Sequence, residues 1–526
     1  MFHSRQVLAN VVQYHGVSPS IATGAQSMGV LQELWVHFIL ALAGWLQRRP
    51  DISIHRGKGL TMRQRGGTLA DPKLLVRSPY LHTLQKGDQF LVWHSLFGNP
   101  TILNEDAHAY LARFSEPTAR ATVQNLYEGV AIADQPLSTF RRLRFINPLG
   151  FDERAFLQER IQRRSDQGLD GSFIDYLELR ASEACNFACS YCIAQNATRV
   201  HNRRYKKLMD LETAKKAVDL YAQLLLRTGK KRAEMTFGGG EPTLNWPLIQ
   251  QTIDYIDRTY SSQLPFLFYL NSNLSLLDRE RIAFIKAHRV RISPSIDGPN
   301  AVANDRTRKT SRGEGTFETI MASLQGLRRA GVRLRSCSVT TNQTNFAFVE
   351  RRFIDWAQRQ GFRSVNVNID VMNDDDLEPA WVASRLMEVV RYARELQIGV
   401  SGFWRRPAEN LGSSLLRHRT GFCGAVRGDN LVVDPAGDIY SCGYSNQVIG
   451  SAHSFASFFD VGGRYHRFLQ RVAPLSQEYC RGCEIEGYCG GGCLATQEFN
   501  EKDNRKVRQM CELYRLMTRE LLLDLV

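Results

Sequence analysis

Residues 184–193 read Ala-Cys-Asn-Phe-Ala-Cys-Ser-Tyr-Cys-Ile, which places Cys185, Cys189 and Cys192 at a CxxxCxxC spacing. Thiolate is the usual protein ligand of iron–sulfur clusters. Three thiolates this close can hold three irons of a 4Fe–4S cube and leave the fourth iron open, so that another molecule binds there. A zinc ion with a fourth ligand from elsewhere is the alternative that this run alone leaves open.

A second set of cysteines lies toward the C-terminal end. The chain has 11 cysteines, and only Cys337 falls outside the two sets; the second set is Cys423, Cys442, Cys480, Cys483, Cys489, Cys493 and Cys511. Disulfides would require an oxidising compartment. The five cysteines between 480 and 511 are one too many for one zinc ion. Glycines crowd residues 482–492, where they let backbone N–H groups approach cluster sulfurs.

Between the two sets, six β-rich apolar runs alternate with amphipathic stretches. The runs are 174–180, 234–237, 266–270, 290–295, 332–340 and 364–369. Residues 211–228 repeat apolar side chains at three- and four-residue steps, which predicts an amphipathic helix. The alternation predicts a parallel α/β fold. In such folds functional groups gather where strands end, and the cysteine loop and Gly238-Gly-Gly-Glu-Pro242 follow the first two runs.

These features together resemble the radical S-adenosylmethionine (SAM) superfamily with a C-terminal SPASM extension. The resemblance spans roughly residues 175–515. It implies a partial (β/α)6 radical SAM barrel over 171–400 and a SPASM iron–sulfur domain over 415–526. It also implies that SAM chelates the open iron of the first cluster. Reductive cleavage then yields methionine and a 5′-deoxyadenosyl radical that abstracts hydrogen.

The resemblance assigns the SAM amino group to the turn after the second run. Gly239, Gly240 and Glu241 match the GGEP motif, whose backbone and carboxylate hold that ammonium. Asn271-Ser-Asn273 is similar to the family's Thr-Asn-Gly turn, with Leu274 where glycine is usual. This departure concerns the shape of the turn.

The rest of SAM is assigned to the fourth run and the loop after it. Ser295 and Asp297 lie in a Ser-x-Asp-Gly-Pro segment, in which Ser295 reaches the SAM ribose and Asp297 shapes the turn. Arg308 is assigned to the SAM carboxylate, with Arg306 as its rival. A solvated basic loop is the alternative for both arginines.

The C-terminal cysteines resemble the SPASM signature, which implies two auxiliary clusters. One would be held completely, by Cys480, Cys483, Cys489 and Cys511, and the other by Cys423, Cys442 and Cys493. Many relatives supply a further cysteine shortly before the position of Cys423, but residues 416–422 contain none. The free iron is then either capped by His418 or open to substrate, unless His418 is an ordinary surface residue.

Length and charge set wider bounds. A chain of 526 residues suggests about three domains. The formal net charge of +14 fits either an ordinary basic surface or attraction to an acidic partner such as a leader peptide, and no nucleic-acid-binding motif is present. Residues 1–67 differ from the rest as a poorly defined extension, with Met62 as an alternative start. Its apolar run, 30–46, is short and polar-interrupted, so no stable membrane association is expected.

Residues 71–160 predict a small separate domain. A strand is expected at 89–95, an N-cap at Asn104, and helices at 107–114, 119–127 and 138–145. The order resembles the winged-helix-like PqqD domain, which recognises leader peptides. Such a domain offers a strand edge to which a peptide can add. A purely structural N-terminal cap is the alternative.

The resemblance implies a cytoplasmic peptide maturase that crosslinks a ribosomally made precursor peptide (RiPP) through a C–C cyclophane or a thioether. A flavodoxin or ferredoxin would reduce it. The alternatives are a formylglycine-generating enzyme of the anaerobic sulfatase-maturating type, a peptide epimerase using Cys337, and an iron–sulfur electron carrier, which would need no SAM site. The proton acceptor is not identified. Asp370 and the acidic residues 374–376 follow the sixth run at the functional end of the fold, but a solvated acidic loop is the favoured interpretation.

Overall fold

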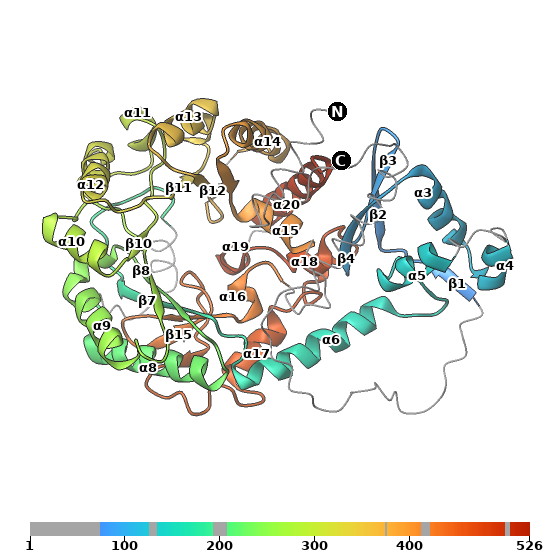
Figure 1. The fold of residues 1–526 in the computed structure, drawn as a ribbon, viewed down its shortest axis with the longest axis horizontal. Helices are drawn as coiled ribbons and strands as arrows, with labels where there is room; N and C mark the ends of the chain where they lie inside the picture. Colours follow the sequence, from blue (N-terminus) through green and yellow to red (C-terminus); the bar gives the residue numbers. More distant parts are fainter. Residues whose placement is uncertain are drawn as a thin grey trace, which may run out of the picture. The chain divides into compact units, whose positions relative to one another are not determined.

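A computed structural model describes residues 74–125, 134–192, 208–373, 376–411, 421–499 and 505–525 (Figure 1). All of them belong to one compact unit, Asp71–Val526. The predictions made for residues 1–67, His418, Asp374 and Asp375 therefore lie outside the described residues.

A parallel α/β core carries the first cysteine loop. In the described residues its strands run in sequence order: β7 (Tyr176–Ser182), β8 (Ala233–Gly239), β9 (Phe266–Leu270) and β10 (Arg291–Ile292), then β11 (Ser336–Thr341), β12 (Ser364–Ile369) and β13 (Gly399–Ser401). A parallel bridge between Ser295 and Ser338 joins the two sheets. The predicted parallel α/β fold is confirmed.

Helices cover one side of these strands, as Figure 1 shows. They are α8 (Leu211–Arg227), α9 (Trp246–Thr259), α10 (Arg279–Ala287), α12 (Phe317–Arg329), α13 (Arg351–Arg359) and α14 (Pro379–Glu395). Helix α8 matches the helix predicted at 211–228 to within one residue. Asp210 caps it by accepting a hydrogen bond from Thr213 N at 2.7 Å.

Alternation along the strands explains why the helices pack on one face only. In β7, Leu177, Leu179 and Ala181 are fully buried and join the main hydrophobic cluster, which also contains the inner faces of the helices. The intervening Tyr176, Glu178 and Arg180 lie outside that cluster. Successive side chains of a strand point to opposite faces, so the other face of the strands is polar.

The fourth and fifth strands differ from their predicted bounds. The fourth is only Arg291–Ile292, because Pro294 has no N–H to donate to the sheet. The fifth starts at Ser336 rather than 332, because Val332 N still donates to Leu327 O at the end of α12.

The N-terminal elements form a small antiparallel sheet with helices. The strands β2 (Leu81–Lys86), β3 (Gln89–His94) and β4 (Gly98–Leu103) pair in that order, and β4 has no second strand partner among the described residues. Asn104 accepts a hydrogen bond from Ala107 N at 3.0 Å, so the predicted N-cap of α3 (Glu105–Ala112) is confirmed. Next come α4 (Arg120–Asn125), α5 (Asp134–Arg142) and β6 (Ile146–Pro148); β6 and β5 (Thr118–Ala119) flank β1 (Leu74–Arg77).

These elements dock onto the cysteine-rich C-terminal region. Trp93 Nε1 donates to Glu484 O at 2.9 Å, and Gly487 N donates to Ser95 O at 2.9 Å. Arg154, on α6 (Glu153–Gln167), pairs with the buried Glu486 at 2.7 Å. In the part of the chain that the structure describes, no helix has the length and apolar character needed to cross a membrane.

Replacing Gly487 with alanine should loosen this junction. An added Cβ would overlap the carbonyl oxygen of Leu96, which is backbone and cannot move away easily. We expect Gly487→Ala to lower the free energy of unfolding by about 2 kcal/mol and to speed limited proteolysis between β6 and α6. Gly399→Ala is the control, because its Cβ would make only ordinary contacts. Equal proteolysis of both variants would contradict this account of the junction.

Candidate functional site

The loop after β7 brings the first three thiols together. Cys185, Cys189 and Cys192 are free and partly buried. Burial, together with the nearby Glu241, Cys189 and Cys192, raises the pKa of Cys185 to about 11. Phe187 N donates to Cys185 Sγ at 3.4 Å and Asn273 Nδ2 reaches the same sulfur at 3.8 Å. N–H groups aimed at sulfur are the contacts that stabilise thiolate ligands of a cluster.

A bridge of three side chains ties the cysteine loop to the predicted ribose and carboxylate segment. Tyr191 donates to Asp297 Oδ2 at 2.5 Å and accepts from Arg308 Nη1 at 2.8 Å. Asp297 also accepts from Thr307 Oγ1 at 2.7 Å. All three bridge residues are buried, and Arg308 Nε has no hydrogen-bond partner in the described residues. Arg308 therefore keeps a donor for a ligand beside the thiols.

Glu241 is fully buried at the end of β8 and is already well hydrogen-bonded. Its Oε1 accepts from Thr243 N at 3.0 Å, from the Thr243 hydroxyl and from Ser272 Oγ at 2.9 Å, and its Oε2 accepts from Asn273 N at 2.7 Å. Burial nevertheless raises the pKa of this carboxyl. Glu241 thus braces the ends of β8 and β9, and its role toward an ammonium stays a prediction.

Gly239 and Gly240 let the turn after β8 press against the cysteine loop. A Cβ on Gly239 would overlap Ser182 O and one on Gly240 would overlap Ala184 O. Gly240 N donates to Ser182 O at 2.7 Å, and Glu241 N donates to Ala184 O at 2.8 Å. The glycines therefore fix the distance between the turn and the three thiols.

The seven C-terminal cysteines lie in two sets of thiols that influence one another electrostatically. One group contains Cys480, Cys483, Cys489 and Cys511. Burial is the largest cause of their raised pKa values, and the neighbouring thiols of the group add to it; the pKa of Cys511 rises to about 11. The other holds Cys423, Cys442 and Cys493. Within the described residues, no three His, Cys, Asp or Glu side chains are arranged to hold a single metal ion. The role of these cysteines as cluster ligands stays a prediction.

The backbone around these cysteines suits cluster ligands. The N–H group two residues after a cysteine turns back toward its sulfur; the donors are Tyr444, Ile485, Gly491 and Ala495, which follow Cys442, Cys483, Cys489 and Cys493. Such N–H···S contacts offset the negative charge of thiolate-bound iron–sulfur clusters. The donor set therefore fits the cofactors that the resemblance implies.

Tyr514 adds a second sign of that fit. It lies on α20 (Arg505–Leu523), one turn after Cys511, and is 1% exposed. Its surroundings include the thiols of Cys489 and Cys511 from one group and of Cys493 from the other. Its hydroxyl makes no hydrogen bond in the part of the chain described. A buried hydroxyl without a partner is costly, and a cluster sulfur beside it would accept the bond.

Sequence reasoning missed a polar group on the inner face of β7. β14 (Asn430–Val433) pairs with β7, and this places Gly443 beside the strand, where Arg180 Nη1 donates to its carbonyl. Arg180 Nη2 also pairs with Glu183 Oε2 at 2.7 Å. Burial raises the pKa of Glu178, which lies next to Gly443, and Tyr444 is close to Cys192 and Cys442. The available signal was the alternation of charged residues with leucines in this strand.

Other candidates have different places in the structure. Arg306 is exposed and stacks on Phe348, with Cζ 5.4 Å from the ring centre, whereas Arg308 faces the thiols. Leu274 adopts φ 66°, so the turn keeps the glycine-like conformation despite the side chain. Cys337 is fully buried in β11, as expected of a core residue.

One expectation about the acidic loop is wrong. Asp370 is buried and not solvated: it accepts from Met372 N at 3.0 Å and from Asn373 Nδ2 at 2.7 Å, and burial raises its pKa. Asp376 is exposed and pairs with Arg505 at 2.9 Å.

Comparisons with known proteins agree with this geometry. Residues 179–341 match the family model of the Radical SAM superfamily. Radical SAM cyclopropyl synthase TigE of Paramaledivibacter caminithermalis is 22% identical over 465 residues, which cover 85% of this chain and 96% of that protein. Mycofactocin maturase MftC of Mycobacterium tuberculosis is 26% identical over 361 residues, 65% of this chain and 83% of that protein. The solved structure of native anSMEcpe with bound AdoMet has the same fold, with a TM-score of 0.55 and 18% identity over 67% of this chain and 99% of that one.

Removing single cysteines should separate the groups. Cys489→Ala and Cys493→Ala each remove one cysteine from a different group. We expect each variant to lose about four irons and about four sulfides per chain after anaerobic reconstitution. Cys337→Ala is the matched control, because that thiol is buried away from both groups. Unchanged iron in Cys489→Ala, or an equal loss in Cys337→Ala, would contradict the grouping.

Tyr514→Phe should change a reduction potential without removing iron. Loss of a hydrogen bond to sulfur disfavours the more negative, reduced cluster, so the midpoint potential of a C-terminal cluster should fall by roughly tens of millivolts. Potentiometric titration followed by EPR measures the shift. Tyr465→Phe is the control, since that hydroxyl donates to Gly428 O at 2.9 Å instead. Identical potentials in Tyr514→Phe and the wild type would exclude the bond.

Proposed function

We propose that this chain, a radical SAM enzyme related to the SPASM-type peptide maturases, takes hydrogen from a side chain of a ribosomally made precursor peptide and closes a crosslink within it. The observation that carries the proposal is the meeting of one thiol triad, the GGEP turn and the Tyr191 bridge, together with two further thiol groups. The match to 96% of a cyclopropyl synthase supports it.

The proposal assigns each cofactor to residues already described. Cys185, Cys189 and Cys192 would hold the first 4Fe–4S cluster, and SAM would contact Gly239, Gly240, Glu241, Ser295, Asp297 and Arg308. When bound, these two groups supply a carbon-centred radical that can attack an unactivated C–H bond. The seven C-terminal cysteines would hold two auxiliary clusters. A flavodoxin or ferredoxin-type reductant and the reducing cytoplasm suit this many free thiols.

The polar face of the strands supports a peptide substrate. Asn366 and Asn368 alternate with buried apolar residues on β12, and their side-chain oxygens are buried without a hydrogen-bond partner in the described residues. Ser338 and Thr340 occupy the matching positions of the neighbouring β11. Unpaired amide oxygens are costly unless a ligand supplies donors, and the N–H groups of a peptide backbone would do so.

The finer fold assignments belong to the same proposal. The strands β7–β12 are assigned to a partial (β/α)6 barrel over 171–400, followed by a SPASM domain over 415–526. Residues 71–160 are assigned to a PqqD-like domain. The edge position of β4 supports that assignment, because a leader peptide can add to such an edge as a strand.

A carbon–carbon bond is the product we propose. The relative matched over nearly its whole length is named a cyclopropyl synthase, and a cyclopropyl ring is closed by carbon–carbon bonds. Formylglycine formation is the second candidate, because a cysteine-type anaerobic sulfatase-maturating enzyme of Clostridium perfringens is 20% identical over 92% of its length. The N-terminal elements that dock beside the cysteines favour a leader-dependent enzyme.

High-resolution mass spectrometry of the small peptide encoded nearby, co-expressed anaerobically with this enzyme, tests the proposal. We expect the peptide to lose two hydrogen atoms per crosslink, with fragmentation blocked between the joined residues. Cys185→Ala should leave the mass unchanged, because the first cluster loses a ligand.

The same experiment separates the alternatives. A product that reacts with a hydrazide probe contains formylglycine. An unchanged mass with deuterium taken up at Cα from heavy water indicates epimerisation. Either result would refute the crosslinking proposal, and modification by Cys185→Ala would refute the assignment of the cluster.

A further inference from the structure

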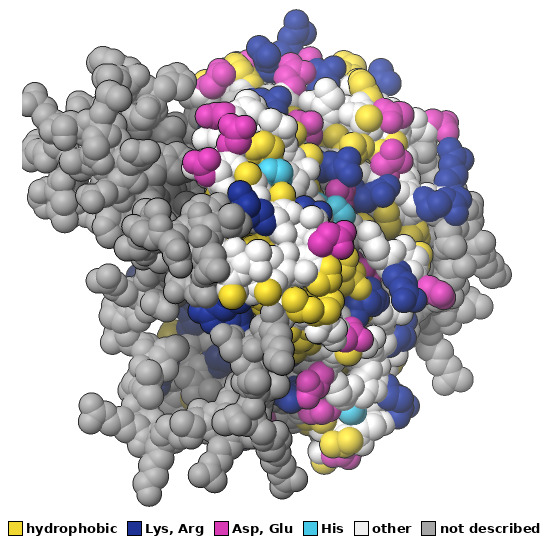
Figure 2. Space-filling model, turned by 90° about the vertical axis from the view of Figure 1, so that its right-hand side faces the viewer, with side chains coloured by type: hydrophobic (Ala, Val, Ile, Leu, Met, Phe, Trp, Pro, Cys, Tyr) yellow, Lys and Arg dark blue, Asp and Glu magenta, His cyan; other side chains and the backbone are white. Residues whose placement is uncertain are grey.

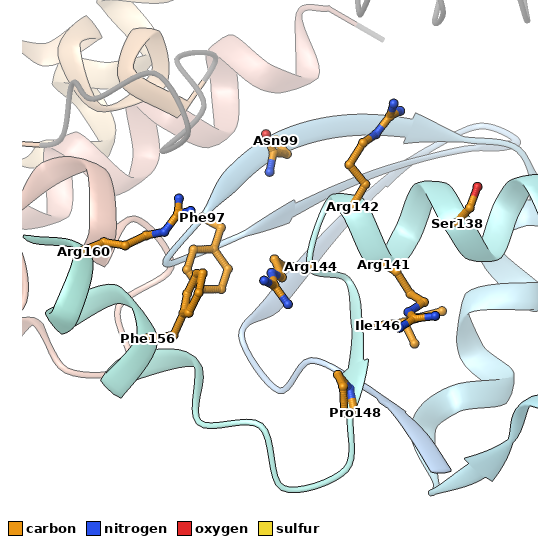
Figure 3. A pocket seen from close by; sticks show the side chains of 10 residues that line it. All are labelled: Phe97, Asn99, Ser138, Arg141, Arg142, Arg144, Ile146, Pro148, Phe156 and Arg160. Carbon is orange, nitrogen blue, oxygen red and sulfur yellow. The ribbon is translucent and has the colours of Figure 1, made fainter. Parts of the chain in front are cut away.

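An arginine-lined cavity lies among the N-terminal elements, and no cysteine is among its lining residues. Its volume is 480 Å³, and its ten lining residues include Arg141, Arg142, Arg144 and Arg160 but no acidic residue. Figure 3 shows Arg144 and Arg160 near Phe156, while Arg141 and Arg142 extend from the end of α5. No carboxylate is among the lining residues, so Arg142, Arg144 and Arg160 bring positive charge to the cavity.

Aromatic rings hold two of these guanidinium groups in place. Arg144 Cζ lies 4.8 Å from the centre of the Phe156 ring, and Arg160 Cζ lies 4.8 Å from the same ring. Arg144 also stacks on Phe151 at 4.7 Å. A guanidinium stacked by its face keeps its N–H edges free, and these edges match the two oxygens of a carboxylate.

Three of the four arginines make no ion pair in the part of the chain described. Within the described ranges, no ion pair includes Arg142, Arg144 or Arg160. By contrast, two other arginines on α6, the helix of Arg160, do form ion pairs: Arg154 with Glu486 and Arg163 with Glu159. Burial lowers the pKa of Arg144, the charges of Arg160 and Arg141 lower it further, and the Glu153 carboxylate offsets part of this effect. Crowded like charges of this kind are stabilised by a bound anion.

The surrounding surface makes the cavity distinctive. Figure 2 shows basic and acidic side chains interspersed over the face that it displays. Inside the cavity the walls combine arginine with apolar side chains, Phe97, Ile146 and Pro148. Such walls suit an acidic side chain carried on a peptide better than a free ion. Asn99, on the edge strand β4, also lines the cavity.

We propose that this cavity binds glutamate or aspartate side chains of an acidic segment in the precursor peptide and so anchors the peptide beside β4. The inference rests on the proposed function, because it names the chemistry by which the partner of that enzyme is recognised. The formal net charge of +14 would steer an acidic segment toward the enzyme.

Fluorescence anisotropy with a defined probe tests the proposal on the full-length reconstituted protein. The probe is a short fluorescein-labelled peptide in which glutamate alternates with leucine, and its counterpart carries glutamine in place of glutamate. We expect the glutamate peptide to bind at least about tenfold more tightly than the glutamine peptide, and Arg142→Gln/Arg160→Gln to remove about that factor.

Arg163→Gln is the matched control. Arg163 lies on the same helix as Arg160, and its replacement removes one of the two positive charges that the double variant removes, but its side chain is exposed and pairs with Glu159. We expect it to change binding by less than about twofold. A loss equal to that of the double variant would mean that only overall charge matters and would overturn the proposal.

Equal binding of the two peptides would also overturn the proposal. So would displacement of the glutamate peptide by inorganic phosphate but not by chloride at the same ionic strength, because that result would indicate a phosphate site. If the double variant melts early, the exposed Arg142→Gln alone carries the test. Because the readout is binding and not turnover, an unmodified precursor would refute the proposed function and leave this result interpretable.

Discussion

A thiolate held away from water needs donors around it, and the cysteine loops of this chain meet that need with their own backbone. The N–H groups of Phe187, Tyr444 and Ala495 each point at the sulfur of the cysteine two residues earlier. A local turn at each cysteine therefore supplies the donor, and no distant residue is needed for it. The packing of strands and helices then brings these cysteine loops close to one another.

The two faces of the strands divide that work. The apolar face of β7, β11 and β12 packs under the helices and fixes the positions of the strand ends. The other face carries Glu178, Arg180 and the asparagines of β12, which do not contribute to the core. Because side chains alternate along a strand, a single run of residues both builds the core and lines the place where a polar substrate would lie.

Glu486 links the N-terminal elements to one thiol group. It stands between Cys483 and Cys489, pairs with Arg154 on α6 and accepts from Gly482 N at 3.1 Å. The carboxylate is fully buried, so removal of Arg154 would leave an uncompensated charge. An ion pair therefore connects α6 to the segment that carries Cys483 and Cys489.

The sequence by itself determined what local spacing controls. It identified the spacing of the thiol triad and the cap at Asn104, because both depend on neighbours in the chain, and the alternation of strands and helices predicted the parallel α/β fold. Only the tertiary structure decided which distant groups meet: Tyr191 between Asp297 and Arg308, Tyr514 against both thiol groups, and the burial of Asp370, which its acidic surroundings had disguised as a solvated loop. These contacts join segments up to about a hundred residues apart, and no periodicity or spacing records which surfaces will pack together.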